Sequence, residues 1–263
     1  MTRTVYAARL ARAAHQGEAA GQRQPGCPAG QLRIPVAGGP LLHRQRLTDL
    51  IDRAARRRVA LVCAPAGAGK TVACAWWAAA RPGGRRVAWL TLKAGDDQAW
   101  FWADVCASLT RARAVPPEAV RSLQDASAED FPLRLVEVAR LFIAPIVLML
   151  DNAHALTDGT VLAGLDVLIR HAAPALSLVL AGRRPPGLQL GRLQASGELA
   201  MVGAASLACT PDEVDAYLAL LGLGRDAASQ GALLDLSASQ LTAALGICGG
   251  HPAWGHPGTT PTG

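Results

Sequence analysis

The sequence has 263 residues, of which 51% are hydrophobic, enough to bury the core of one large domain or two small ones. The longest apolar run, residues 141–150, is interrupted by Pro145 and is too short to cross a bilayer. Residues 1–20 have no apolar segment typical of a signal peptide. We therefore expect no membrane partner, and six scattered cysteines without metal-ligand spacing suit a reducing cytoplasm.

The net charge of +6 is concentrated near the N-terminus. The first 60 residues carry eleven Arg and three acidic residues, whereas the remainder carries 15 basic and 17 acidic groups. Residues 1–40 mix Arg, Gln, Gly and Pro without periodicity, which predicts a disordered or loosely attached basic arm. A basic arm can contact nucleic acid, but this one lacks interleaved aromatic residues, so DNA binding by this chain alone is not expected.

A candidate phosphate-binding loop follows the first predicted strand. After an amphipathic helix over residues 42–51, residues 59–63 are apolar, and a small-residue loop then leads into a helix-forming segment, residues 72–80. Small residues let backbone N–H groups curl around a phosphate at a helix N-terminus, as in a P-loop. Lys70 would reach the β- and γ-phosphates of ATP, or the β-phosphate of ADP, and the Thr71 hydroxyl would bind Mg²⁺. The candidate nucleotide-binding residues are Ala64, Pro65, Ala66, Gly67, Ala68, Gly69, Lys70 and Thr71.

The loop departs from the usual P-loop pattern at one position. The pattern begins with Gly, and here that position is Ala64, while Gly67 lies inside the loop. The alternative is an ordinary glycine-rich turn before a helix. The flanking strand and helix favour the nucleotide interpretation.

A candidate acidic residue follows a later buried strand. A strand is predicted over 87–92, helices over about 99–112 and 131–142, and a linker opens at Pro116-Pro117. Residues 146–150 are fully apolar and are followed by Asp151, as expected of a Walker B strand. In a parallel sheet this Asp lies at the carboxyl edge beside the phosphate loop, where it would bind Mg²⁺ directly or through water. The alternative is an Asp that only caps the next turn.

The remaining pattern defines the fold class and the domain boundaries. A helix is predicted around 161–169 and a fourth buried strand over 176–181, so strands alternate with helices. This order predicts an α/β fold, a P-loop NTPase three-layer sandwich with a mainly parallel sheet. Arg183 follows the fourth strand, where it would sense a γ-phosphate or would simply be a surface Arg. The candidate catalytic residues are therefore Asp151 and Arg183.

From residue 205 the pattern is helical only. Thr210-Pro211-Asp212-Glu213 and Ser237-Ala238-Ser239-Gln240 are capping boxes that open two helices. We expect a P-loop NTPase domain over 41–204, the start of a small helical (lid) domain over 205–252, and a disordered tail over 253–263.

Several motifs together resemble one known family. The chain is similar to the N-terminal ATPase module of the MalT-like/LuxR-type transcriptional regulators, which belong to the STAND class of P-loop NTPases. The order and spacing of the motifs agree as well as their type, over residues 41–252. The matching stretches are Leu61–Thr71, Val87–Leu92 with Gly95-Asp96-Asp97 and Phe101-Trp102, Val147–His154, Leu178–Arg183 with Leu190–Leu193, and Thr210–Glu213.

The resemblance implies a role for each matching residue. It implies that Lys70 and Thr71 bind phosphate and Mg²⁺, that Asp151 is the Walker B acid, that Arg183 is the sensor, and that Pro252 belongs to a turn that touches the adenine. It also implies an ADP-bound resting form and an ATP-bound form that self-associates. In that family an inducer binds a C-terminal repeat domain, and a C-terminal helix-turn-helix binds DNA.

Two departures from the family shape the functional expectation. Asn152 replaces the second acidic residue that usually follows the Walker B Asp, and an amide cannot accept a proton from water, so hydrolysis is expected to be weak or absent. The sequence ends at Gly263 without repeats or a helix-turn-helix, which suggests a truncated or degenerate member.

Three functions follow from these observations. The leading hypothesis is an ATP-binding signalling switch module with weak or no ATP hydrolysis, and the alternative is a nonenzymatic interaction fragment without nucleotide turnover. A P-loop kinase is less favoured, because its only candidate bases, Asp96 and Asp97, resemble turn residues.

Overall fold

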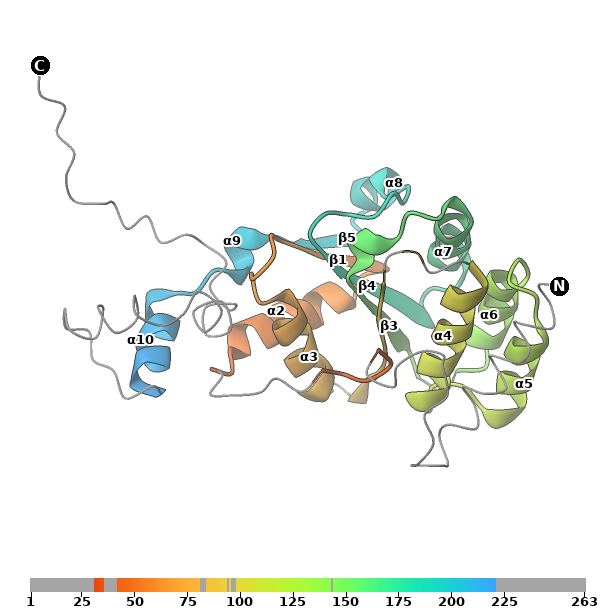
Figure 1. Ribbon diagram of the computed structural model, residues 1–263, viewed down its shortest axis with the longest axis horizontal. Helices are drawn as coiled ribbons and strands as arrows, with labels where there is room; N and C mark the ends of the chain where they lie inside the picture. Colours follow the sequence, from red (N-terminus) through yellow and green to blue (C-terminus); the bar gives the residue numbers. More distant parts are fainter. Residues whose placement is uncertain are drawn as a thin grey trace, which may run out of the picture.

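The core of the protein is a five-stranded parallel sheet, seen in a computed structural model (Figure 1). The structure describes residues 31–35, 42–80, 84–93, 95, 98–142 and 144–220. Within them, the strands are β1 Val59–Cys63, β2 Arg86–Thr91, β3 Ile146–Asp151, β4 Leu176–Gly182 and β5 Leu199–Val202. All neighbouring pairs are parallel, in the order β2-β3-β4-β1-β5. The predicted α/β class is therefore confirmed.

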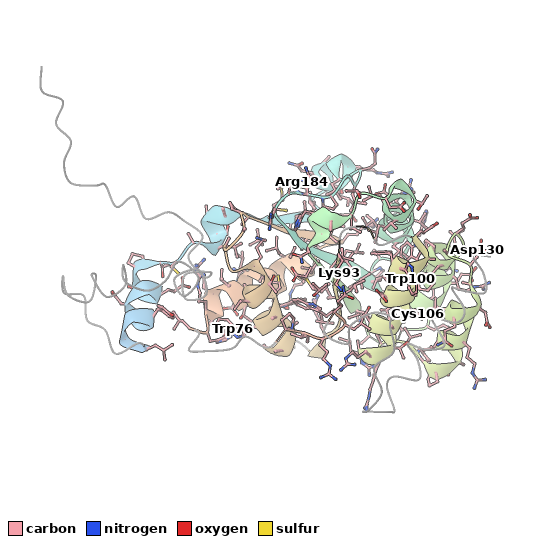
Figure 2. The ribbon with its side chains drawn as sticks, in the orientation of Figure 1. Trp76, Lys93, Trp100, Cys106, Asp130 and Arg184 are labelled. Carbon is pink, nitrogen blue, oxygen red and sulfur yellow. The ribbon has the colours of Figure 1, made fainter. Side chains whose placement is uncertain are left out.

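Helices cover both faces of the sheet and complete three layers (Figures 1 and 2). One face packs against α2 Gln45–Ala55 and α3 Lys70–Ala80. The other packs against α4 Gln98–Arg111, α5 Pro117–Asp125, α6 Phe131–Ala139 and α7 Gly159–His171. The shorter or later elements are the 3₁₀ helix η2 Ala153–Ala155, α8 Gly191–Ala195, α9 Ala204–Leu207 and α10 Pro211–Leu220.

The strands are apolar on both faces because each face contacts a helix layer. Leu178 and Leu180 of β4 point into the cluster with α4 to α7, whereas Val179 between them points into the cluster with α2 and α3. All six residues of β3 are buried, Asp151 included. A buried carboxylate at the end of an apolar strand marks the edge where the candidate site lies.

Two sequence predictions about local structure were wrong. The linker expected at Pro116-Pro117 is the start of α5, because Pro116 stands at the N-cap, Pro117 at the first helical position and Glu118 in the first turn. The helix expected to reach residue 142 ends at Ala139. In addition, β5 was not predicted, although it pairs with β1 along four residues.

The capping box at the start of α10 is confirmed, and it has a second role. The Glu213 amide donates to Thr210 Oγ1 at 3.2 Å, and the Thr210 amide donates to Glu213 Oε2 at 3.0 Å. Arg44 and Arg46, at the start of α2, also donate to the Glu213 carboxylate, at 3.0 to 3.2 Å. Burial alone raises the pKa of Glu213, but these hydrogen bonds outweigh it and hold the pKa at about 2.

Other predictions fall on residues that the structure does not describe. These are the basic arm before residue 31, the second capping box, Pro252 and the tail, and they stay predictions. Among the described residues, no helix combines the length and apolarity needed to cross a membrane.

Candidate functional site

The loop between β1 and α3 has the backbone of a phosphate-binding loop. Gly67 and Gly69 have φ values of 79° and 75°, in the left-handed region that glycine adopts at low cost. Helix α3 begins at Lys70, so the N–H groups of its first turn have no acceptor within the helix. These N–H groups and the helix dipole favour an anion at this point.

Lys70 lies against the loop that precedes it. Its Nζ donates to the carbonyl oxygen of Ala64 at 2.8 Å and to that of Pro65 at 2.7 Å. Burial lowers the pKa of Lys70, the nearby Asp151 carboxylate opposes this shift, and Arg183 adds to it. Phosphate oxygens would replace the two carbonyls as acceptors for this ammonium, with charge as an added attraction.

Thr71 and Asp151 meet although they are 80 residues apart. The Thr71 hydroxyl donates to Asp151 Oδ2 at 3.0 Å and lies 3.2 Å from Oδ1, and the Asn152 amide donates to Oδ1 at 3.0 Å. Burial raises the pKa of Asp151, while the hydrogen bonds from Thr71 and Asn152 and the charge of Lys70 lower it. These distances could not be predicted from the sequence alone, because they arise only when β1 and β3 end at the same carboxyl edge of the sheet.

The pair of Thr71 and Asp151 fits a magnesium ion. Mg²⁺ is held in proteins by one or two oxygen ligands and takes the rest of its shell from substrate phosphates and water. A hydroxyl and a carboxylate in contact beside the phosphate loop supply such a donor set. No group of three or more His, Cys, Asp or Glu capable of holding a metal occurs among the described residues, so phosphates would have to complete the shell.

The sensor candidate Arg183 is exposed just beyond β4, between the strands that carry the loop and Asp151. Its backbone amide lies 3.5 Å from His154 Nδ1. Burial lowers the pKa of His154, and the positive charges of Arg183 and Lys70 lower it further, so the imidazole is neutral at pH 7. No role was predicted for His154; the signal that could have identified it is its position three residues after Asp151, on η2.

Asn152 is held in an unusual backbone conformation. Its φ of 59° and ψ of 34° lie in the left-handed region, which Asn tolerates better than most residues. Its side chain is exposed at the carboxyl edge of the sheet. The position next to Asp151 is thus open to solvent and is occupied by an amide.

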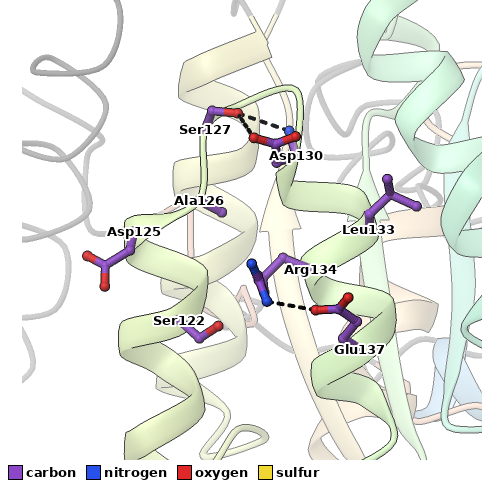
Figure 3. Close-up of a pocket in the computed structure, with 8 residues that line it drawn as sticks. All are labelled: Ser122, Asp125, Ala126, Ser127, Asp130, Leu133, Arg134 and Glu137. Atoms are coloured by element: carbon purple, nitrogen blue, oxygen red, sulfur yellow. Dashed lines mark hydrogen bonds and ion pairs between the residues drawn. The ribbon is translucent and has the colours of Figure 1, made fainter.

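The structure does not place every residue that the sequence singles out. Asp96 and Asp97 fall outside the described residues, as does Pro252, and Lys93 is exposed. A cavity of about 930 Å³ lies elsewhere, between α5 and α6, and its charged lining residues include one ion pair, Arg134 with Glu137 (Figure 3). Arg134 contacts Glu137 at 2.8 Å, and Ser127 contacts Asp130 at 2.6 Å.

A glycine loop between a strand and a helix, with a Thr–Asp pair on a parallel sheet, defines a P-loop NTPase. The family model described as "AAA domain" matches residues 53–187, just over half of the chain. The chain belongs to this family, and membership implies nucleotide binding.

The chain is also similar to part of a larger curated protein. Over 200 residues it is 31% identical to the serine/threonine-protein kinase PknK of Mycobacterium tuberculosis, and equally to that of Mycobacterium bovis. The match covers 74% of this chain and 18% of the kinase. The chain therefore spans under a fifth of the length of these relatives.

Two solved structures share parts of the fold at low identity. One is a STAND protein with a tetratricopeptide repeat sensor from Pyrococcus horikoshii, with 14% identity and a TM-score of 0.44 over 67% of this chain and 24% of that chain. The other is PCH-2 of C. elegans, with 11% identity and a TM-score of 0.31 over 86% of this chain and 49% of that one.

Proposed function

We propose that the chain is an ATP-binding switch module of a signalling protein, with weak or no ATP hydrolysis. One observation carries the proposal: the Thr71 hydroxyl contacts the Asp151 carboxylate at 3.0 Å beside Lys70, while the next position is the amide Asn152. Thr71, Asp151 and Lys70 are suited to holding a magnesium nucleotide. Asn152 is not the carboxylate that would activate water for hydrolysis.

Each residue of the site has a distinct task in this proposal. Lys70 exchanges the carbonyls of its own loop for phosphate oxygens, and the glycines let the backbone approach them. Thr71 and Asp151 hold Mg²⁺, which would neutralise charge on the β- and γ-phosphates. Arg183 lies within electrostatic range of Lys70, which is consistent with a sensor of the γ-phosphate.

The finer assignment is to a switch related to LuxR-type regulators. It rests on the motif resemblance and predicts self-association in the ATP state, without DNA binding by this chain alone. A cytoplasmic location is part of the proposal, because Cys63, Cys74 and Cys106 are thiols outside any disulfide. A P-loop kinase remains less favoured, since its candidate bases Asp96 and Asp97 resemble turn residues and lie outside the described residues.

The binding part is tested by Lys70→Ala. We expect loss of ATP binding, because the ammonium supplies a full positive charge at the phosphates. Lys93→Ala is the matched control, since Lys93 is the other lysine of the sequence and is exposed. Calorimetric titration with Mg-ATP measures both, and equal binding by the Lys70 variant would make the loop assignment wrong.

The catalytic part is tested by Asn152→Asp. A general base typically accelerates such a step about 10²–10⁴-fold, so phosphate release should rise while ATP affinity stays nearly constant. Lys70→Ala serves as the blank, and His154→Ala tests whether the neutral imidazole substitutes as proton acceptor. Fast hydrolysis by the unmodified chain, insensitive to His154→Ala, would refute the proposed defect.

A further inference from the structure

A basic hollow lies at the amino edge of the sheet, opposite the phosphate loop. It is lined by residues just before or at the starts of all five strands, among them Arg58 before β1, Arg85 before β2, Pro145 before β3 and Glu198 before β5. Its volume is about 430 Å³, within the range of small-molecule sites. Because the strands are parallel, this hollow and the nucleotide site occupy opposite ends of the molecule.

Four guanidinium groups line the hollow, those of Arg56, Arg57, Arg58 and Arg85. Arg56 pairs with Asp52 at 2.9 Å, and Arg58 pairs with Glu198 at 2.9 Å. Two positive charges are therefore left without a carboxylate in this hollow. Glu198 is the one carboxylate among the lining residues.

Capping of helix ends accounts for only part of these arginines. Arg85 donates from Nη1 to the carbonyl of Ala55 at the end of α2, and Arg58 donates from Nη1 to Ile169 in the last turn of α7. A guanidinium carries five N–H donors, so each retains donors beyond its cap. Arg57 makes no side-chain hydrogen bond or ion pair with any residue that the structure describes.

One donor is buried and unpartnered. The Nε of Arg58 has no acceptor, but it is inaccessible to solvent, so a ligand in the hollow does not reach it in this structure. The donors left for a ligand are those of Arg57 and the ones of Arg85 that do not cap α2. A guanidinium donates parallel N–H groups to phosphate oxygens, and a phosphate supplies negative charge that would offset the excess of arginines in the hollow. Ala55, Pro145, Pro174 and Leu176 add apolar lining, which suits a ligand with carbon atoms as well.

We propose that this hollow binds a small organic phosphate, with Arg57 and Arg85 holding the phosphate group and Arg58, already paired with Glu198, at its side. The site is independent of the phosphate loop and of the function proposed for it. Its ligand would bind at the amino ends of the strands; at their carboxyl ends, β1 leads into the phosphate loop and β3 ends at Asp151. The arginines and the apolar lining residues define the class of ligand: a small molecule with one phosphate group attached to an apolar or uncharged moiety.

The test uses phenyl phosphate and benzoate, which share a ring but differ in the charged group. The full chain carrying Lys70→Ala, which lacks the main cation of the loop, is titrated with each compound by calorimetry. We expect saturable 1:1 binding of phenyl phosphate and binding of benzoate at least about tenfold weaker. Adding Arg57→Ala should raise the Kd for phenyl phosphate about tenfold or more, which is the factor that one charge-assisted hydrogen bond supplies.

Controls separate site binding from general charge and from misfolding. Arg121→Ala removes an equal charge from the exposed face of α5 and should leave the affinity unchanged. Arg57 is exposed and unpaired, so its variant should keep the melting temperature of the parent. No binding of phenyl phosphate, equal binding of benzoate, or equal loss in the Arg57 and Arg121 variants would each overturn the proposal.

Discussion

Gly164→Ala tests the packing of α7 against α4, on which the position of β3 depends. Gly164 is buried, and an added Cβ would overlap Cζ2 of Trp102 and lie 2.8 Å from Cγ of Pro132. Trp102 cannot retreat, since it is fully buried, stacks on Phe131 at 5.3 Å and meets Phe101 at 4.7 Å. Overpacking of this kind costs about 1–3 kcal/mol, and the higher helix propensity of Ala offsets up to about 1 kcal/mol.

We therefore expect a net loss of about 1–2 kcal/mol, which lowers the melting temperature by roughly 2–8 °C for a domain of this size. The assay is thermal unfolding followed by circular dichroism. Gly159→Ala in the same helix is the matched control, because no atom lies within 4 Å of its added Cβ, and it should change stability by less than about 0.5 kcal/mol. A Gly164 variant as stable as the parent would refute the packing described for these helices.

Three further predictions concern the helical segment, the nucleotide edge and the basic arm. The pKa of Glu213 is about 2 in the folded protein and 4.5 ordinarily, so the ionised carboxylate contributes its full stabilisation above about pH 4.5 and loses it as the pH falls toward 2. The difference in unfolding free energy between the parent and Glu213→Gln, measured by urea denaturation, should therefore shrink between pH 4.5 and pH 2. Gly182→Ala would place a Cβ 3.0 Å from the His154 amide nitrogen, so it should reduce the ATP-dependent rise in melting temperature, and an unchanged rise would contradict this. The intact chain should give no DNA mobility shift at physiological salt, and a shift lost on deleting residues 1–40 would overturn that expectation.

The sheet could be predicted largely from the sequence because four of its five strands are apolar runs flanked by helical patterns. The prediction failed where the sequence pattern was short or fitted two different structures. β5 is only four residues long and includes Met201, which is 60% exposed, so it lacks the pattern of a buried strand. Paired prolines at Pro116-Pro117 suggest a linker or a helix start, and only the helix packed on α4 and α6 decides between them.

For the candidate site, residue types could be predicted but contacts could not. Thr71 and Asp151 were both expected near Mg²⁺, and the structure places them in direct contact. The position of Lys70 on the carbonyls of Ala64 and Pro65 depends on the fold of the loop, which residue types leave open. Arg44 and Glu213 are 169 residues apart, so no local pattern could have paired them.

The attachment of α10 to α2 through Glu213 links two distant parts of the chain mechanically. Arg44 and Arg46 stand at the first turn of α2, and α2 packs along α3, the helix that begins with Lys70. A helix moves as a rigid rod, so a shift of α3 on phosphate binding would be carried to α10 along α2. Protonation of Glu213 near its pKa of about 2 would weaken that path, whereas salt would act on it little because Arg44 and Glu213 are largely buried.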